Sequence, residues 1–156
     1  MNYWLIKSEP GEFSIDDLAA CSGQTEPWGG VRNYQARNML RDQMRSGDQV
    51  FFYHSNTSSP GIVGIAEVVR EGYPDDTAFD PDDKHYDPKS DLSNPRWYQV
   101  DIKLVRKLER SITLSELKAS EQLDGLPLLR RGNRLSVMQV TRMQWKTILK
   151  LEKKIA

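Results

Sequence analysis

The sequence contains one cysteine, two histidines and no long apolar run, and each scarcity excludes a class of protein. Because Cys21 stands alone, an internal disulfide is impossible and a zinc site built from several thiolates is excluded. His54 and His85 do not have the spacing of paired metal ligands, so we expect no metal. No apolar stretch approaches the roughly 18 residues of a membrane span, and the N-terminal segment becomes polar at Lys7. We therefore expect a soluble, cytoplasmic protein without a cofactor or membrane contact.

The sequence also has no net charge, because its 22 basic residues balance its 22 acidic ones. A protein that binds many phosphates usually has a basic domain, because each released counterion adds affinity. Any nucleic-acid contact must therefore come from a local basic patch and a specific pocket. The 156 residues fit one compact domain, so we expect a single domain over residues 1–156 and favour a monomer.

The order of predicted elements indicates an α+β domain built around a small curved sheet or barrel. Segments rich in β-branched and aromatic residues predict strands at residues 2–8, 48–55, 61–70, 96–109 and 135–140. Helices are predicted over 33–45 and after the capping residues Ser14, Thr113 and Thr141. The turn-rich stretch 22–31 is expected to lack regular structure, and the aspartate- and proline-rich stretch 72–95 to form a long solvated lid.

The strongest local signal is a glycine-flanked tryptophan followed by a helix with several arginines. Trp28 lies between Pro27 and Gly29, so its indole can swing into a groove at little steric cost. Asn33 offers a donor and an acceptor that suit the edge of a base. Neighbouring candidates for base or phosphate contacts are Arg32, Tyr34, Arg37 and Arg41. The pattern leaves open a plainer interpretation, in which Trp28 fills the side of the core and the arginines are solvated.

Two strand ends carry polar groups of the kind that gather around ligands. Tyr53, His54 and Ser55 end one predicted strand, and His54 could act as a general base, although no acidic partner or nucleophile is recognisable beside it. Lys7 and Ser8 end the first strand. A lysine with a nearby acid could perform acid–base chemistry, but such pairs are more often surface ion contacts.

A third candidate group is the arginine-rich turn near residue 132. Arg130, Arg131 and Arg134 surround Gly132 and Asn133, an arrangement that favours contacts with phosphate. The alternative is a charged surface turn without a ligand.

Several long segments together resemble the EVE domain, and the resemblance extends over essentially the whole chain. The segments are YWLIKSEP (3–10), WGGVRNYQARN (28–38), GDQVFFYHSN (47–56), PGIVGIAEVVREGYPD (60–75), PRWYQVD (95–101) and LRRGNRLSV (129–137). The resemblance implies a PUA-like fold, a curved β-barrel of about five to six strands with peripheral helices. It further implies a reader of a modified base in DNA or RNA, such as 5-methylcytosine or an oxidised form.

The resemblance also assigns roles to individual residues. Trp28 would form the wall of a base pocket and Ser8 would hydrogen-bond the base, with Lys7 close by. The remaining pocket residues would be Asn33, Tyr34, Tyr53, His54, Ser55, Trp97 and Asn133. The residue pattern described above, and not the resemblance, predicts phosphate contacts from Arg32, Arg37, Arg41, Arg131 and Arg134.

Two other functions stay open from the sequence. The first is an amidohydrolase or deacylase acting on modified nucleosides, because ASCH-type relatives of the fold include such enzymes and Lys7 with an acid could serve them. The second is a protein-interaction module that uses the 72–95 loop as a docking surface.

Overall fold

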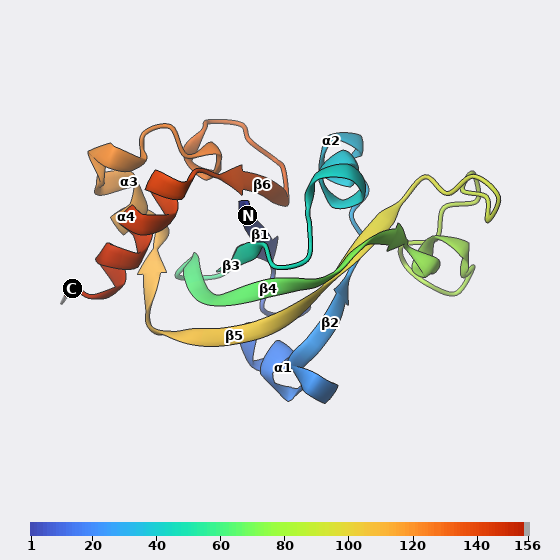
Figure 1. The fold of residues 1–156 in the computed structure, drawn as a ribbon, viewed down its shortest axis with the longest axis horizontal. Helices are drawn as coiled ribbons and strands as arrows, with labels where there is room; N and C mark the ends of the chain where they lie inside the picture. The colour runs from blue at the N-terminus through green and yellow to red at the C-terminus, as the bar shows by residue number, and fades with distance from the viewer. Residues whose placement is uncertain (155–156) are drawn as a thin grey trace.

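A six-stranded mixed sheet organises residues 1–154, the part of the chain that this computed structural model describes (Figure 1). The strand order is β2-β5-β4-β3-β1-β6, with β1 and β3 parallel and the other neighbours antiparallel. The strands are β1 (Tyr3–Ser8), β2 (Thr25–Trp28), β3 (Gln49–His54), β4 (Gly61–Pro74), β5 (Tyr98–Thr113) and β6 (Val137–Val140). The predicted α+β class with a curved sheet is confirmed.

The sheet curves but does not close into the predicted barrel, since β2 and β6 lie at opposite edges and do not pair within residues 1–154. Curvature comes from the long β4–β5 hairpin, whose register shifts four times along its length. Such bulges bend a strand and increase its twist. Both edge strands have only four residues, and Pro27 interrupts hydrogen bonding in β2, which limits pairing with other chains.

Helices cover both faces of the sheet and create two cores. Side chains alternate along β1, so Leu5 packs in one core while Trp4 and Ile6 pack in the other. The first core is covered by α3 (Leu114–Ala119) and α4 (Arg142–Glu152), and the second by α1 (Ile15–Ala20) and α2 (Tyr34–Asn38). Short helical turns are η1 (Ser22–Gln24), η2 (Met39–Gln43), η3 (Asp76–Phe79), η4 (Glu121–Leu123) and η5 (Pro127–Leu129).

The predicted helix starts are confirmed by their caps. The hydroxyls of Ser14, Thr113 and Thr141 each accept the backbone N–H three residues further on, which satisfies an amide that the helix itself leaves unpaired. None of the helices in residues 1–154 is long and apolar enough to cross a membrane. The same residues contain no cluster of three or more metal-ligating side chains.

Two expectations for residues 22–45 were wrong. Residues 25–28 form β2, because their partner for pairing is the distant strand β5. The predicted continuous helix is α-helical only to Asn38, and η2 continues it as a wider π turn. The backbone of β4 packs closely against this π turn. A Cβ on Gly72 would lie 2.6 Å from the Leu40 carbonyl oxygen.

A buried carboxylate ties the N-terminal strand to the turn before β3. Asp48 is almost fully buried and accepts hydrogen bonds from the Trp4 indole at 2.9 Å and from the backbone N–H groups of Asn2 and Arg45, each at 3.0 Å. Trp4 is itself fully buried, so its N–H depends on this acceptor.

We predict that Asp48→Ala lowers the free energy of unfolding by about 3 kcal/mol, because three donors lose their acceptor and the indole N–H stays buried. Urea denaturation at neutral pH measures the change. Asp48→Asn keeps one acceptor oxygen and should lose clearly less. If the alanine variant were as stable as the wild type, these hydrogen bonds would not support the fold.

Candidate functional site

A surface hollow with a volume of about 700 Å³ lies where the ends of β1 and β2 meet the 72–95 loop. We call it the first hollow. Its wall includes Ser8, Trp28, the Gly29–Gly30 turn and Gln99, and its rim includes charged residues of the loop. A volume of this size lies within the range of ligand-binding pockets, about 300–1,000 Å³.

Trp28 packs on the core and also lines this hollow. Its indole makes edge contacts with the rings of Phe13 and Phe52, at centroid distances of 5.9 and 5.5 Å. The side chain is only partly buried, so part of the ring system remains in the hollow wall. The two interpretations of Trp28 that the sequence left open, core residue and pocket wall, therefore both describe part of its environment.

Ser8 and Lys7 end β1 at the same hollow. Ser8 is largely buried and its hydroxyl donates to the Phe13 carbonyl oxygen. That bond uses the only hydroxyl proton, so toward a ligand Ser8 can serve as an acceptor. Burial lowers the pKa of Lys7, which is half-buried.

Two glycines form a part of the wall where a larger residue would displace its neighbours. Gly30 has φ of +73°, and a Cβ there would lie 2.7 Å from the His85 ring. A Cβ on Gly29 would lie 2.5 Å from the Gln99 side-chain oxygen and 2.9 Å from Asp75. The backbone therefore runs in direct contact with the side chains that surround it, and the turn has a fixed position.

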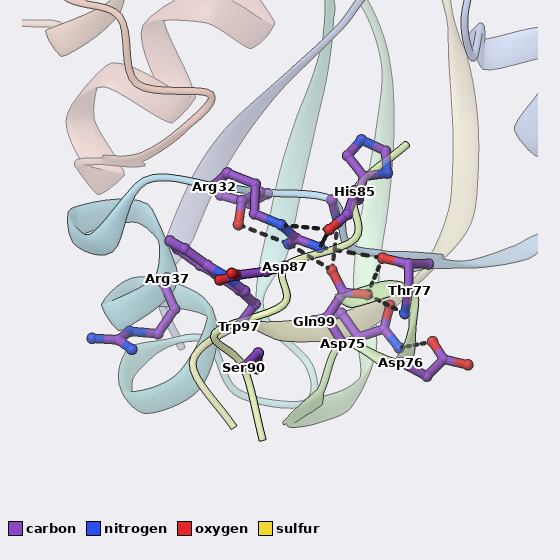
Figure 2. A network of polar contacts seen from close by, with 12 residues as sticks. Arg32, Arg37, Asp75, Asp76, Thr77, His85, Asp87, Ser90, Trp97 and Gln99 are labelled. Atoms are coloured by element: carbon purple, nitrogen blue, oxygen red, sulfur yellow. Dashed lines mark hydrogen bonds and ion pairs between the residues drawn. The ribbon is translucent and has the colours of Figure 1, made fainter. Parts of the chain in front are cut away.

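Figure 2 shows the polar network that holds this turn against the 72–95 loop, centred on Arg32 and Asp75. Arg32 donates to Asp75 at 3.0 Å and, through two nitrogens, to the His85 carbonyl oxygen at 2.6 and 3.1 Å. Asp75 is fully buried and also accepts from the Gly30 N–H at 2.7 Å and from Thr77. Burial alone would raise the pKa of Asp75, but the hydrogen bonds from Thr77, Gly30 and Arg32 outweigh it and lower the pKa.

Arg32, one of the residues expected to contact phosphate, has its guanidinium engaged in the network just described. Arg37 is similarly engaged, donating to the Arg96 carbonyl oxygen at 2.7 Å and to Asn38 at 2.9 Å. Arg41 pairs with Asp42 at 2.8 Å on the surface. The structure brings none of these three arginines into either hollow.

The expected pocket roles of Trp97 and Tyr34 are also not supported by their positions. Trp97 is buried, donates its indole N–H to Asp87 at 2.7 Å and stacks on Tyr34 at 4.9 Å. Arg32 lies over the same indole, at 5.3 Å from the ring centroid. This stack supports the loop from outside the first hollow.

The end of β3 points away from the first hollow as well. Tyr53 is buried in the core beneath α3 and α4. His54 accepts the Ile15 N–H on its Nε2 atom at 3.1 Å, so this nitrogen caps α1. Ser55 donates its backbone N–H to the Ser8 carbonyl oxygen at 2.9 Å. Tyr53 and His54 lie on opposite faces of β3, and neither they nor Ser55 are among the residues that line the first hollow.

The remaining expected residues gather at a second hollow of about 400 Å³. We call it the second hollow; Asn33, Asn133, Arg131 and Arg134 contribute to its lining. Asn33 caps α2 by accepting the Ala36 N–H at 3.0 Å. The predicted pocket residues therefore divide between two places and do not converge on one.

Sequence reasoning missed several residues of the first hollow, including Glu12, Glu26, Asp76, Lys84, His85 and Gln99. Lys84 of the loop pairs with Glu12 at 2.6 Å, which joins the loop to the segment after β1. No local motif marks these positions. The only available signal was the length of the 72–95 loop, which does border the hollow.

Comparison with known proteins gives one consistent family. Residues 2–151 match the model of the EVE domain. The chain is 48% identical to thymocyte nuclear protein 1 of Gallus gallus, over 96% of this chain and 68% of that protein. It is 45% identical to the Homo sapiens protein, over 98% and 75%.

Solved structures agree with this similarity. The human THYN1 protein, determined in complex with DNA containing 5-methylcytosine, superimposes with a TM-score of 0.95 at 43% identity over 100% of both chains. A protein of Pseudomonas syringae gives a TM-score of 0.91 at 50% identity, over 96% and 99%. An ASCH protein of Zymomonas mobilis gives 0.58 at 11% identity, over 97% and 99%, which shows a shared fold alone.

The neutral state of His54 predicts an acid-sensitive contribution to stability. Burial lowers its pKa below the ordinary value of 6.5, so between the two values the unfolded chain binds more protons. The free energy of unfolding should therefore fall as pH decreases through this window. Urea denaturation between about pH 7.5 and 5 should show a shallower fall for His54→Gln than for the wild type. If the free energy of unfolding fell equally with pH in both proteins, His54 would not be the group responsible.

Removal of the Arg32 guanidinium should loosen the 72–95 loop. We predict that Arg32→Gln lowers the free energy of unfolding by roughly 2–3 kcal/mol, because a buried carboxylate loses its cation but keeps neutral donors. Amide exchange should quicken at residues 75–97. The matched control is Arg41→Gln, whose partner Asp42 is exposed and which should change neither property. Equal behaviour of the two variants would argue against the network.

Proposed function

This chain belongs to the EVE domain family, and on that basis we propose that it is a DNA-binding protein without catalytic activity that holds a modified base in the first hollow. The human THYN1 protein, similar over the full length, was solved with DNA containing 5-methylcytosine. The observation that carries the proposal is the partly exposed indole of Trp28 in the wall of a hollow that also presents polar side chains.

Stacking on Trp28 provides the main attraction for a flat heterocycle. Phe13 and Phe52 hold the indole by edge contacts, so the ring position is fixed before a ligand arrives. Stacking of a base on an aromatic side chain contributes about 1–3 kcal/mol. A methyl group removed from water against the indole adds about 0.8 kcal/mol, roughly a fourfold preference for the methylated base.

The polar lining suits the edge of a base that carries N–H donors. Ser8 offers its oxygen, and the side-chain oxygen of Gln99 lies beside the Gly29 backbone at the floor. Glu26 and Asp76 add carboxylates to the wall. Carboxylates accept from the exocyclic amino group of cytosine, so this acceptor-rich set favours cytosine over a base with acceptors only.

The charge of the lining indicates that phosphates stay outside. Four carboxylates, from Glu9, Glu12, Glu26 and Asp76, face this hollow, against the ammonium groups of Lys7 and Lys84. An anionic wall repels phosphodiesters, but it accepts a neutral base that has left its stack. A base flipped out of a strand satisfies this constraint because its phosphates remain at the rim.

The hydrolase alternative required Lys7 beside an acid. Lys7 forms no ion pair in the described part of the chain, and the likeness to the ASCH protein extends to the fold alone. No particular observation therefore favours hydrolysis over binding, and the same holds for a docking role of the 72–95 loop.

We predict that Trp28→Ala weakens binding of a duplex with one 5-methylcytosine by about five- to one-hundred-fold, the loss of one stacking contact. Fluorescence anisotropy with labelled duplexes, methylated and unmethylated, measures the affinities. Thermal unfolding should show that the variant still folds. An RNA strand of the same sequence tests whether the polymer matters.

Two controls sharpen this test. Trp28→Phe keeps a smaller aromatic face and should retain part of the affinity. Tyr86→Ala removes an exposed aromatic ring that does not line the first hollow and should leave binding unchanged. Full affinity of Trp28→Ala for every duplex would rule out the first hollow as the base site.

A further inference from the structure

The second hollow contains a group of cations that the fold itself does not use. Arg130, Arg131 and Arg134 line it, and all three are exposed. Within residues 1–154 their guanidinium groups make no hydrogen bond or ion pair. Of the other arginines, Arg32, Arg37, Arg41, Arg45, Arg106 and Arg110 have partners. Arg70, Arg96 and Arg142 do not line either hollow. A guanidinium with free donors in a concave surface is suited to an oxyanion such as phosphate.

The turn that carries these arginines is fixed in shape before any ligand binds. Gly132 has φ of +78°, a conformation that glycine adopts without strain. Asn133 uses both ends of its side-chain amide within the turn, donating to the Pro127 carbonyl oxygen and accepting the Leu135 N–H at 2.9 Å. Preorganisation of this kind reduces the entropy that binding would otherwise cost. Asn133 therefore fixes the shape of the turn.

Charge is divided unevenly along a chain whose net charge is zero. Residues 127–154 contain eight basic side chains and one acidic one, and that acid, Glu152, is buried against Arg106 at 2.8 Å. Residues 72–95 contain seven aspartates and only two lysines. A polyanion is therefore attracted toward the C-terminal quarter and repelled by the loop, although the whole molecule is neutral.

The two hollows are close neighbours. Gly30 lines the first and Asn33 the second, so along the chain they are separated by at most about 10 Å. On the other side, the Lys7 N–H donates to the Ser136 carbonyl oxygen at 2.9 Å, which places the first hollow beside the strand that follows the arginine turn. This separation equals roughly two or three nucleotides at about 3.4 Å of rise each.

We propose that the second hollow is a phosphodiester-binding site, and that Arg130, Arg131 and Arg134 hold the DNA backbone within a few nucleotides of the base in the first hollow. The strand then runs from the first hollow across residues 30–33 toward the basic C-terminal quarter, away from the aspartate-rich loop. This inference rests on the proposed function, because it takes the first hollow as the base site.

The test compares a ligand that has phosphates with one that has none. The double variant Arg131→Gln/Arg134→Gln should bind a 5-methylcytosine duplex about tenfold more weakly, and the slope of log affinity against log salt should become shallower by about two. Free 5-methyl-2′-deoxycytidine, followed by NMR titration, lacks phosphates and should bind both proteins equally.

The matched control removes the same charge from α4. Arg142→Gln/Lys146→Gln replaces two exposed cations that do not line the second hollow, and should change affinity and salt slope clearly less. If the two double variants changed affinity and salt slope equally, general electrostatic attraction would explain the effect without a specific site. That result would overturn the proposal. Unchanged duplex binding by Arg131→Gln/Arg134→Gln would also overturn the proposal for the second hollow. If Trp28→Ala lost binding in the same assay, the base site in the first hollow would still be supported. A wild-type protein that binds no duplex would overturn both.

Discussion

The buried carboxylate of Asp75 is the contact on which the geometry of the first hollow depends. It joins two segments, since its oxygens accept from the Gly30 N–H and the Arg32 guanidinium of the turn after β2 and from Thr77 of its own loop. A fully buried carboxylate is tolerated only when its oxygens are satisfied by several donors. These donors must therefore stay in place, and the turn and the loop that form the cavity wall stay with them.

This arrangement explains why arginines that look suited to phosphate binding serve other purposes. Arg32 follows the glycine turn of the first hollow, yet its guanidinium donates to the Asp75 carboxylate, to carbonyl oxygens and to the Thr77 hydroxyl. A group of three arginines with free donors lies on the separate turn near residue 132. One group of cations thus builds the site, and a second group is available to a ligand. A neutral protein can in this way combine an anionic cavity with a cationic surface beside it.

Much of the chain could be read from its sequence. The capping residues Ser14, Thr113 and Thr141 and the main strands were predicted because they depend on the chemistry of short segments. Among the expected pocket residues, Lys7, Ser8 and Trp28 line the first hollow. Their positions followed from the resemblance to the EVE domain and not from periodicity, which left Trp28 between two interpretations.

By itself the sequence determined the element types, the helix starts, the balance of charge and the family. Only the tertiary structure decided which strand ends share a cavity, that residues 25–28 pair with β5, and that Arg32 has its partner 43 residues away at Asp75. The physical reason is that these contacts join residues far apart in the chain. Whether a strand-end side chain such as Tyr53 enters the cavity or the opposite core depends on which sheet face it occupies, and that face is set by packing on both sides.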